Sequence, residues 1–201
     1  WPTAIAALAW HGDAAFDQAK NRAIQFLLKT EGTHFRHNPS APAAHDTSLK
    51  GWPWNLGTHS FVDPTATALL ALDTAGQAGN ERFREAVNML ISRQLPHGGW
   101  NYGNTLVYGK ELRPFVETTG IALAALAGHA PKEKIGISLA YLKEQAERSR
   151  TPLALGWALF GLGAWGEFPA NGLIWIEETL NKQNKYGPYP TSLLSLLALA
   201  H

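Results

Sequence analysis

Two carboxylates hold equivalent places in a repeated sequence pattern. Asp63 follows an aromatic residue and a valine and precedes a stretch of small residues and leucines, and Glu117 stands in the same place one repeat later. Two carboxylates that open into one cavity can act as general acid and general base. Alternatively, each acid accepts hydrogen bonds from free backbone N–H groups at a helix start. The sequence contains no distance that decides between these hypotheses.

The repeat itself predicts helices that are buried on all sides. Residues 61–72 match residues 115–126, and weaker copies begin at residues 2, 151 and 190. Each copy has a helix-start signal, such as Asp63 followed by Pro64 at the expected first helical position. The residues that follow are apolar on every side, which indicates burial on all faces. We therefore expect inner helices at roughly 2–11, 64–75, 117–128, 151–165 and 190–200.

Segments with one apolar face lie between these inner helices. In residues 82–94 the apolar side chains recur at helical spacing, and charged side chains occupy the remaining positions, namely Arg82, Arg84, Glu85 and Arg93. Similar patterns predict outer helices at 14–30, 82–94, 132–147 and 171–183. Polar and apolar residues nowhere alternate with a period of two over a stretch long enough to predict a sheet. The sequence therefore predicts one all-α domain over residues 1–201, in which inner and outer helices form hairpins.

One segment carries a family resemblance. Residues 90–100, which read Leu90-Ile91-Ser92-Arg93-Gln94-Leu95-Pro96-His97-Gly98-Gly99-Trp100, resemble the repeat shared by squalene cyclases and prenyltransferase β-subunits. Met89 stands where that repeat has an aromatic residue, and residues 183–189 form a weaker copy with Tyr189 in place of the tryptophan. Residues 51–72 also resemble bacterial proteins that carry this repeat. The resemblance implies an α/α toroid, here a partial or open ring of about five hairpins.

The resemblance also implies a chemistry, which can be compared residue by residue. Class II cyclases protonate an alkene through a D-x-D-D-T-A motif, and Asp63 falls on its central acid, with Thr65 and Ala66 matching. Phe61 and Pro64 replace the flanking acids, so a helix-cap role for Asp63 stays open beside the acid role. Glu117 has the equivalent place in the next repeat. We take Asp63 and Glu117 as the candidate catalytic residues.

Aromatic side chains are the candidate ligand contacts. They could line a cavity for an apolar isoprenoid, stack on sugar rings, or serve only as packing residues between hairpins. The residues concerned are Trp52, Trp54, His59, Phe61, Trp100 and Tyr102.

The residue pattern and the resemblance leave three alternative functions open. The first is a prenyltransferase- or squalene-cyclase-like protein that binds or transforms an isoprenoid or other apolar small molecule in the toroid centre. The second is a non-catalytic helical repeat module for binding or scaffolding. The third is a carbohydrate-active α/α toroid. An open arc with an exposed apolar flank would favour association as a homodimer.

Composition argues against several other classes. The chain has no cysteine, so the Asp-Cys-His zinc site of protein prenyltransferases is absent as such. A zinc site without cysteine would need convergence of loop residues, namely His34, His37, His45, Asp46 and His59. We expect no metal and no cofactor. The net charge of +1 and the lack of a basic run argue against nucleic-acid binding. The longest apolar run, residues 152–165, is too short for a membrane span.

Overall fold

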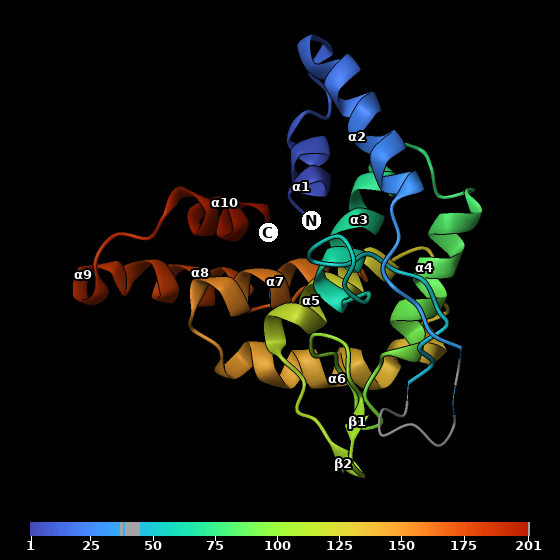
Figure 1. Ribbon diagram of the computed structural model, residues 1–201. Helices are drawn as coiled ribbons and strands as arrows, with labels where there is room; N and C mark the ends of the chain where they lie inside the picture. Colours follow the sequence, from blue (N-terminus) through green and yellow to red (C-terminus); the bar gives the residue numbers. More distant parts are fainter. Residues whose placement is uncertain (37, 39–44, 201) are drawn as a thin grey trace. The chain divides into compact units, whose positions relative to one another are not determined.

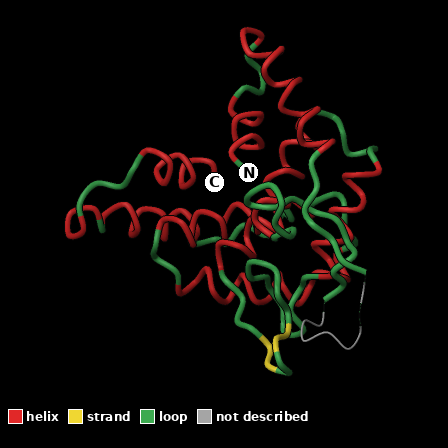
Figure 2. The backbone as a smooth tube through the Cα atoms, in the orientation of Figure 1, coloured by secondary structure: helices red, strands yellow, loops and turns green. Residues whose placement is uncertain are grey.

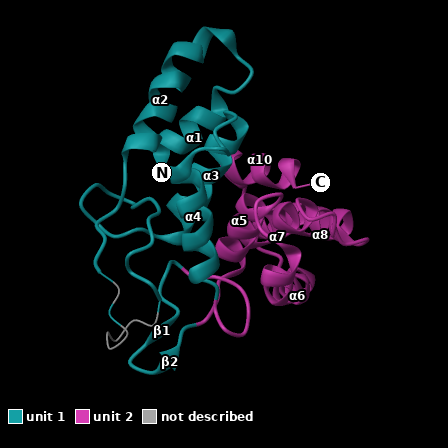
Figure 3. Ribbon diagram, turned by 90° about the vertical axis from the view of Figure 1, so that its right-hand side faces the viewer, with its two compact units in different colours: residues 1–94, 102–112 teal, residues 95–101, 113–201 magenta. Residues whose placement is uncertain are grey.

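The structure is a computed structural model that describes residues 1–36, 38 and 45–200 (Figures 1 and 2). Contacts within the chain divide it into two compact units (Figure 3). Unit 1 comprises residues 1–94 and 102–112, and unit 2 comprises residues 95–101 and 113–201. Helices dominate both units, so the prediction of an all-α protein is confirmed. The prediction of a single domain over the whole chain stays a prediction.

Unit 1 is built around one buried helix. Its elements are α1 (Pro2–Ala9), a 3₁₀ turn (Ala14–Phe16), α2 (Asp17–Lys29), α3 (Val62–Thr74), α4 (Glu81–Ser92) and a small hairpin of β1 (Leu106–Val107) and β2 (Lys110–Glu111). In the hairpin Leu106 pairs with Glu111 and Val107 with Lys110. Helix α3 packs against α1, α2 and α4 (Figure 1). Its small residues and leucines allow this close approach on several sides.

Unit 2 is arranged around α7. Its helices are α5 (Val116–Leu126), α6 (Lys132–Arg148), α7 (Pro152–Gly163), α8 (Gly172–Asn181), α9 (Gln183–Tyr186) and α10 (Thr191–Leu199). Helix α7 packs against α5, α6, α8 and α10. A cluster of buried side chains joins α7 to the C-terminal helix, with Leu155 and Leu159 against Leu197 and Ala200.

The expected helices are all present, but the expected burial is wrong for the first and last. Helix α1 buries only Ala4 and Ala7, and α10 buries only Leu197. Their other apolar side chains are accessible, with Ile5 43% and Leu199 67% exposed. An all-apolar sequence marks burial on every side only when neighbours cover every side, as they do for most of α3 and α5.

The starts of α3 and α5 also differ from the expectation. Helix α3 begins at Val62, with the extended Phe61 as its N-cap residue, so Pro64 occupies the third helical position. Proline is tolerated there because the first four N–H groups of a helix have no partner within it. Asp63 is therefore a first-turn residue and not the N-cap. Glu117 has the same position in α5, behind the N-cap residue Phe115.

Each of these helices is attached to a glycine–tryptophan segment by a threonine, and we call this arrangement a junction. In the first junction, Trp52 N donates to Thr65 Oγ1 at 2.8 Å, and Phe61 N donates to Trp52 O at 3.0 Å. The Thr65 hydroxyl also donates to Trp52 O at 3.4 Å. A single hydroxyl thus satisfies both backbone groups of a buried tryptophan.

The second junction repeats the first atom for atom. Trp100 N donates to Thr119 Oγ1 at 2.9 Å, the same hydroxyl donates to Trp100 O at 3.3 Å, and Phe115 N donates to Trp100 O at 2.8 Å. The glycine before each tryptophan is required by space. A Cβ on Gly51 would overlap the Thr65 hydroxyl, and one on Gly99 would lie 2.9 Å from Thr119 Oγ1. The sequence repeat is therefore a structural repeat of the junction.

Helices α5 and α7 cross with their backbones in contact. A Cβ on Gly120 would overlap the carbonyl of Trp157, and a Cβ on Gly161 would overlap the carbonyl of Gly120. Two helices that are both inner helices by sequence thus leave no room for a ligand at this crossing.

We expect Thr119→Val to lower the free energy of unfolding by about 1–3 kcal/mol, because it removes the partner of a buried N–H. Valine has nearly the same shape and helix propensity as threonine. Thr74→Val is the matched control, since the Thr74 hydroxyl donates to Leu70 O on an exposed helix surface, and its change should stay below about 0.5 kcal/mol. Urea denaturation of both variants measures the difference. Equal effects would contradict the junction.

Gly120→Ala should destabilise the chain by about 1–3 kcal/mol through overlap with the α7 backbone, which outweighs alanine's better helix propensity. Gly136→Ala provides the contrast, because a Cβ at Gly136 in α6 would meet nothing within 4 Å. That substitution should raise stability by about 0.5–1 kcal/mol. Thermal unfolding of the two variants would show shifts of opposite sign, and shifts of the same sign would speak against the close crossing.

Candidate functional site

Trp52 is a packing residue in the structure. Its side chain is 3% exposed, and the indole N–H donates to Leu27 O at 2.9 Å. The guanidinium of Arg82 lies 4.2 Å from the centre of the ring. One face and the polar edge of this indole are engaged within unit 1, and its burial leaves little of the ring for a ligand.

Arg82 has a structural role that its sequence position does not suggest. Its guanidinium donates to the carbonyl oxygens of Lys50 at 3.1 Å, Thr30 at 3.4 Å and Gly51. Burial lowers its pKa, although Glu85 acts in the opposite direction. The helical pattern places Arg82 on the polar side of α4, but the loops before α3 cover that side.

The other predicted aromatic contacts are scattered over different environments. Trp100 is 0% exposed and belongs to the second junction. Trp54 packs edge-on against Trp1, with ring centres 5.5 Å apart. Tyr102 is 51% exposed, and its carbonyl accepts from Val62 N at 2.9 Å. A role of these rings in ligand binding stays a prediction.

The two candidate catalytic carboxylates lie in different units. Asp63 is half-buried in the first turn of α3 in unit 1, and Glu117 is half-buried in the first turn of α5 in unit 2. In unit 2 burial raises the pKa of Tyr141, and the charges of Glu117 and Glu144 add to this shift. The carboxylate pair stays a prediction.

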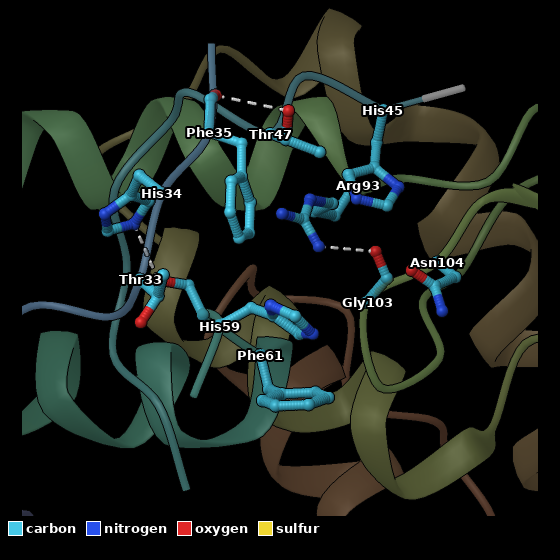
Figure 4. Close-up of a pocket in the computed structure, with 11 residues that line it drawn as sticks. Thr33, His34, Phe35, His45, Thr47, His59, Phe61, Arg93, Gly103 and Asn104 are labelled. Carbon is cyan, nitrogen blue, oxygen red and sulfur yellow. Dashed lines mark hydrogen bonds between the residues drawn. The ribbon is translucent and has the colours of Figure 1, made fainter. Parts of the chain in front are cut away.

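The remaining two predicted residues, His59 and Phe61, line a pocket of about 320 Å³ in unit 1 (Figure 4). The wall comes from four parts of the unit, which are the segment after α2, the residues before α3, the C-terminal end of α4, and Gly103 and Asn104 before β1. The side chains that give the pocket its chemistry are His34, Phe35, His45, His59, Phe61 and Arg93.

Arg93 is the buried charge of this pocket. Arg93 is the residue that directly follows α4 in the chain, and it is 6% exposed. Nη1 donates to Gly103 O at 2.7 Å, whereas Nε has no hydrogen-bond partner in the part of the chain that the structure describes. Burial lowers the Arg93 pKa to about 10, and the carboxylate of Asp46 opposes this shift. The guanidinium therefore stays positively charged at neutral pH.

Two histidines of the pocket have lowered pKa values. His34 Nε2 lies 3.1 Å from Ser60 Oγ, which accepts from Gly51 N at 3.0 Å, and burial lowers the His34 pKa. His45 is 7% exposed, and burial followed by the charge of Arg93 lowers its pKa to about 4, against the effect of Asp46. His45 is therefore neutral at pH 7.

Aromatic rings form another part of the wall. The ring of His59 lies 6.2 Å from that of Phe35 and 6.1 Å from that of Phe61, measured between centres. Figure 4 shows the guanidinium of Arg93 next to His45, with His59 and Phe61 across the pocket. The pocket thus combines a fixed positive charge, titratable donors and apolar faces.

This set of side chains differs from a metal site. Among the described residues, no group of three histidine or acidic side chains is placed to hold a metal ion. Of the histidines considered from the sequence, His34, His45 and His59 line the pocket, whereas His37 lies outside the described residues. The positive charge of Arg93 beside them also disfavours a cation.

Within the described residues, no helix is both long and apolar enough to cross a membrane. Comparison of the chain with family models, with curated proteins and with solved structures gives no significant match. The assignment of a function therefore depends on the pocket and on the sequence resemblance alone.

We expect stability to fall as the pH drops from 6.5 towards 4, because the unfolded chain takes up a proton at His45 near pH 6.5 and the folded chain only near pH 4. From pH 7.5 to pH 5 this histidine alone accounts for a loss of about 2 kcal/mol. Arg93, Asp46 and His59 are the charged or titratable groups that act on it.

Urea denaturation of wild type and of His45→Gln at pH 7.5 and pH 5 measures this loss. The variant should lose markedly less stability than the wild type over this range. His11→Gln, a substitution in the exposed turn after α1, should behave as the wild type. An unchanged pH dependence in His45→Gln would contradict the assignment.

Proposed function

We propose that this chain is a ligand-binding module made of helical hairpins of the α/α-toroid type, with its ligand in the pocket of unit 1. The observation that carries the proposal is the buried Arg93, which faces a pocket of about 320 Å³ with hydrogen-bonding capacity unused. Pockets of this size that combine apolar walls with a few polar groups are the usual form of small-molecule sites.

The toroid part of the proposal is supported by the alternation of inner and outer helices and by the repeated junction. Trp52 and Trp100 occupy the tryptophan place of that junction, and Thr65 and Thr119 attach each tryptophan to the helix that follows. In the squalene cyclase and prenyltransferase repeat, the tryptophan is interpreted as covering the neighbouring hairpin. The burial of both tryptophans and their hydrogen bonds to threonine favour a scaffold role for the repeat residues.

A cyclase- or prenyltransferase-like activity is the second candidate. It is favoured by the equivalent positions of Asp63 and Glu117 in the first turns of α3 and α5. An apolar substrate would need open space at these helix starts. Gly120, one turn after Glu117 in α5, contacts the backbone of α7 and leaves no space for a substrate there. The binding module is therefore the better supported function.

A carbohydrate-active toroid has less support. Sugar rings stack on exposed aromatic faces, and both Trp52 and Trp100 are buried. Association of two copies stays a prediction. The exposed apolar side chains of Leu173 and Ile174 on α8 are of the kind that such association would cover.

Ligand-observed NMR of the full chain with a library of small fragments tests the proposal. We expect some fragments to bind the wild type and to lose at least tenfold in affinity in Thr47→Trp, because the indole would fill the pocket that Thr47 lines. Ser192→Trp, on the exposed side of α10, is the matched control and should retain binding.

Asp63→Asn distinguishes the two candidate functions. It removes the acid that a cyclase would require and leaves the pocket lining unchanged, so binding should persist. Loss of fragment binding in Asp63→Asn, with full binding in Thr47→Trp, would show that the ligand binds at the start of α3 and would overturn the proposal. A wild type that binds no fragment would overturn it as well.

A further inference from the structure

The hydrogen-bonding state of Arg93 gives information about the ligand. A guanidinium carries five N–H donors, and here Nη1 uses one for Gly103 O, while Nε has no partner among the described residues. Leaving a donor of a charged group buried and unpaired is costly. A residue that is 94% buried and keeps such a donor next to a pocket is suited to an acceptor that enters the pocket.

His45 provides a second donor at the same place. Its Nδ1 is buried and has no hydrogen-bond partner in the described part of the chain. Figure 4 shows its ring beside the guanidinium of Arg93. In the neutral ring one tautomer carries a proton on Nδ1, so His45 can donate without being charged.

We propose that the pocket of unit 1 binds a compact oxyanion, a carboxylate or a phosphate, through Arg93 and His45. This inference rests on the proposed binding function and specifies the ligand class. A planar guanidinium pairs with two oxygens of one carboxylate or phosphate group, which a lone carbonyl or hydroxyl cannot provide. The rings of Phe35, His59 and Phe61 would contact an apolar body attached to the anion.

Asp46 is the acidic group that acts on this site. Its charge affects Arg93 and His45, and its Oδ1 accepts hydrogen bonds from Ser48 N at 2.8 Å and from Ser48 Oγ at 2.6 Å. A bound anion would be repelled by this carboxylate. Removal of the Asp46 charge should therefore strengthen anion binding, whereas it would weaken the binding of a cation.

Isothermal titration calorimetry of the full chain at pH 7 with inorganic phosphate, benzoate and benzamide tests the inference. Benzamide has the shape of benzoate without its charge. We expect at least one of the two anions to bind at least tenfold more tightly than benzamide. Tighter binding of benzoate would indicate a carboxylate ligand, and tighter binding of phosphate would indicate a phosphate ligand.

Three variants locate the anion. Arg93→Gln should weaken anion binding at least tenfold and His45→Gln severalfold, whereas Asp46→Asn should strengthen anion binding. If Arg93→Gln does not fold, as judged by circular dichroism, the other two variants still decide. Benzamide binding as tight as the tighter of the two anions, or no effect of His45→Gln and Asp46→Asn, would overturn the oxyanion while leaving the binding module intact. A wild type that binds neither anion would also overturn it, and the fragment experiment then decides the binding function separately.

Discussion

The structure depends on how two buried tryptophans satisfy their backbone groups. A tryptophan that enters the core in an extended segment brings an N–H and a carbonyl away from water, and each needs a partner. Thr65 and Thr119 supply both partners from the first turns of α3 and α5. Because the threonine lies in the helix that the segment leads into, the same hydroxyl also attaches the segment to that helix.

This arrangement explains which residue types surround the junction. The glycine before each tryptophan leaves room for the threonine hydroxyl. The backbone N–H groups of Phe61 and Phe115 donate hydrogen bonds to the tryptophan carbonyls. In unit 1 the guanidinium of Arg82 donates hydrogen bonds to the carbonyl oxygens of Lys50, Thr30 and Gly51 near the first junction. These carbonyl groups are thus paired by a side chain that the helical pattern of the sequence assigns to the surface.

The pocket is lined by residues on both sides of the first tryptophan. His34 and His45 precede Trp52, His59 lies between Trp52 and α3, and all three line the pocket together with Arg93. Ser60 links these residues to the junction, since its hydroxyl accepts from Gly51 N and contacts His34. The residues that hold the fold and those that form the candidate site are therefore neighbours in one stretch of chain, with different roles.

The sequence by itself determined where the longer helices lie, because the period of apolar residues is a local property of the chain, although the exact start of α3 differs from its helix-start signal. It also determined the repeat, with Thr65 and Thr119 in equivalent places. Only the tertiary structure decided what these residues contact. The helical pattern of residues 82–94 places Arg93 among the polar positions, yet Arg93 is buried, and Trp100, which the sequence also offers as a ligand contact, is fully buried in its junction. Burial and pairing depend on segments far apart in the chain, and no local pattern records which segments meet.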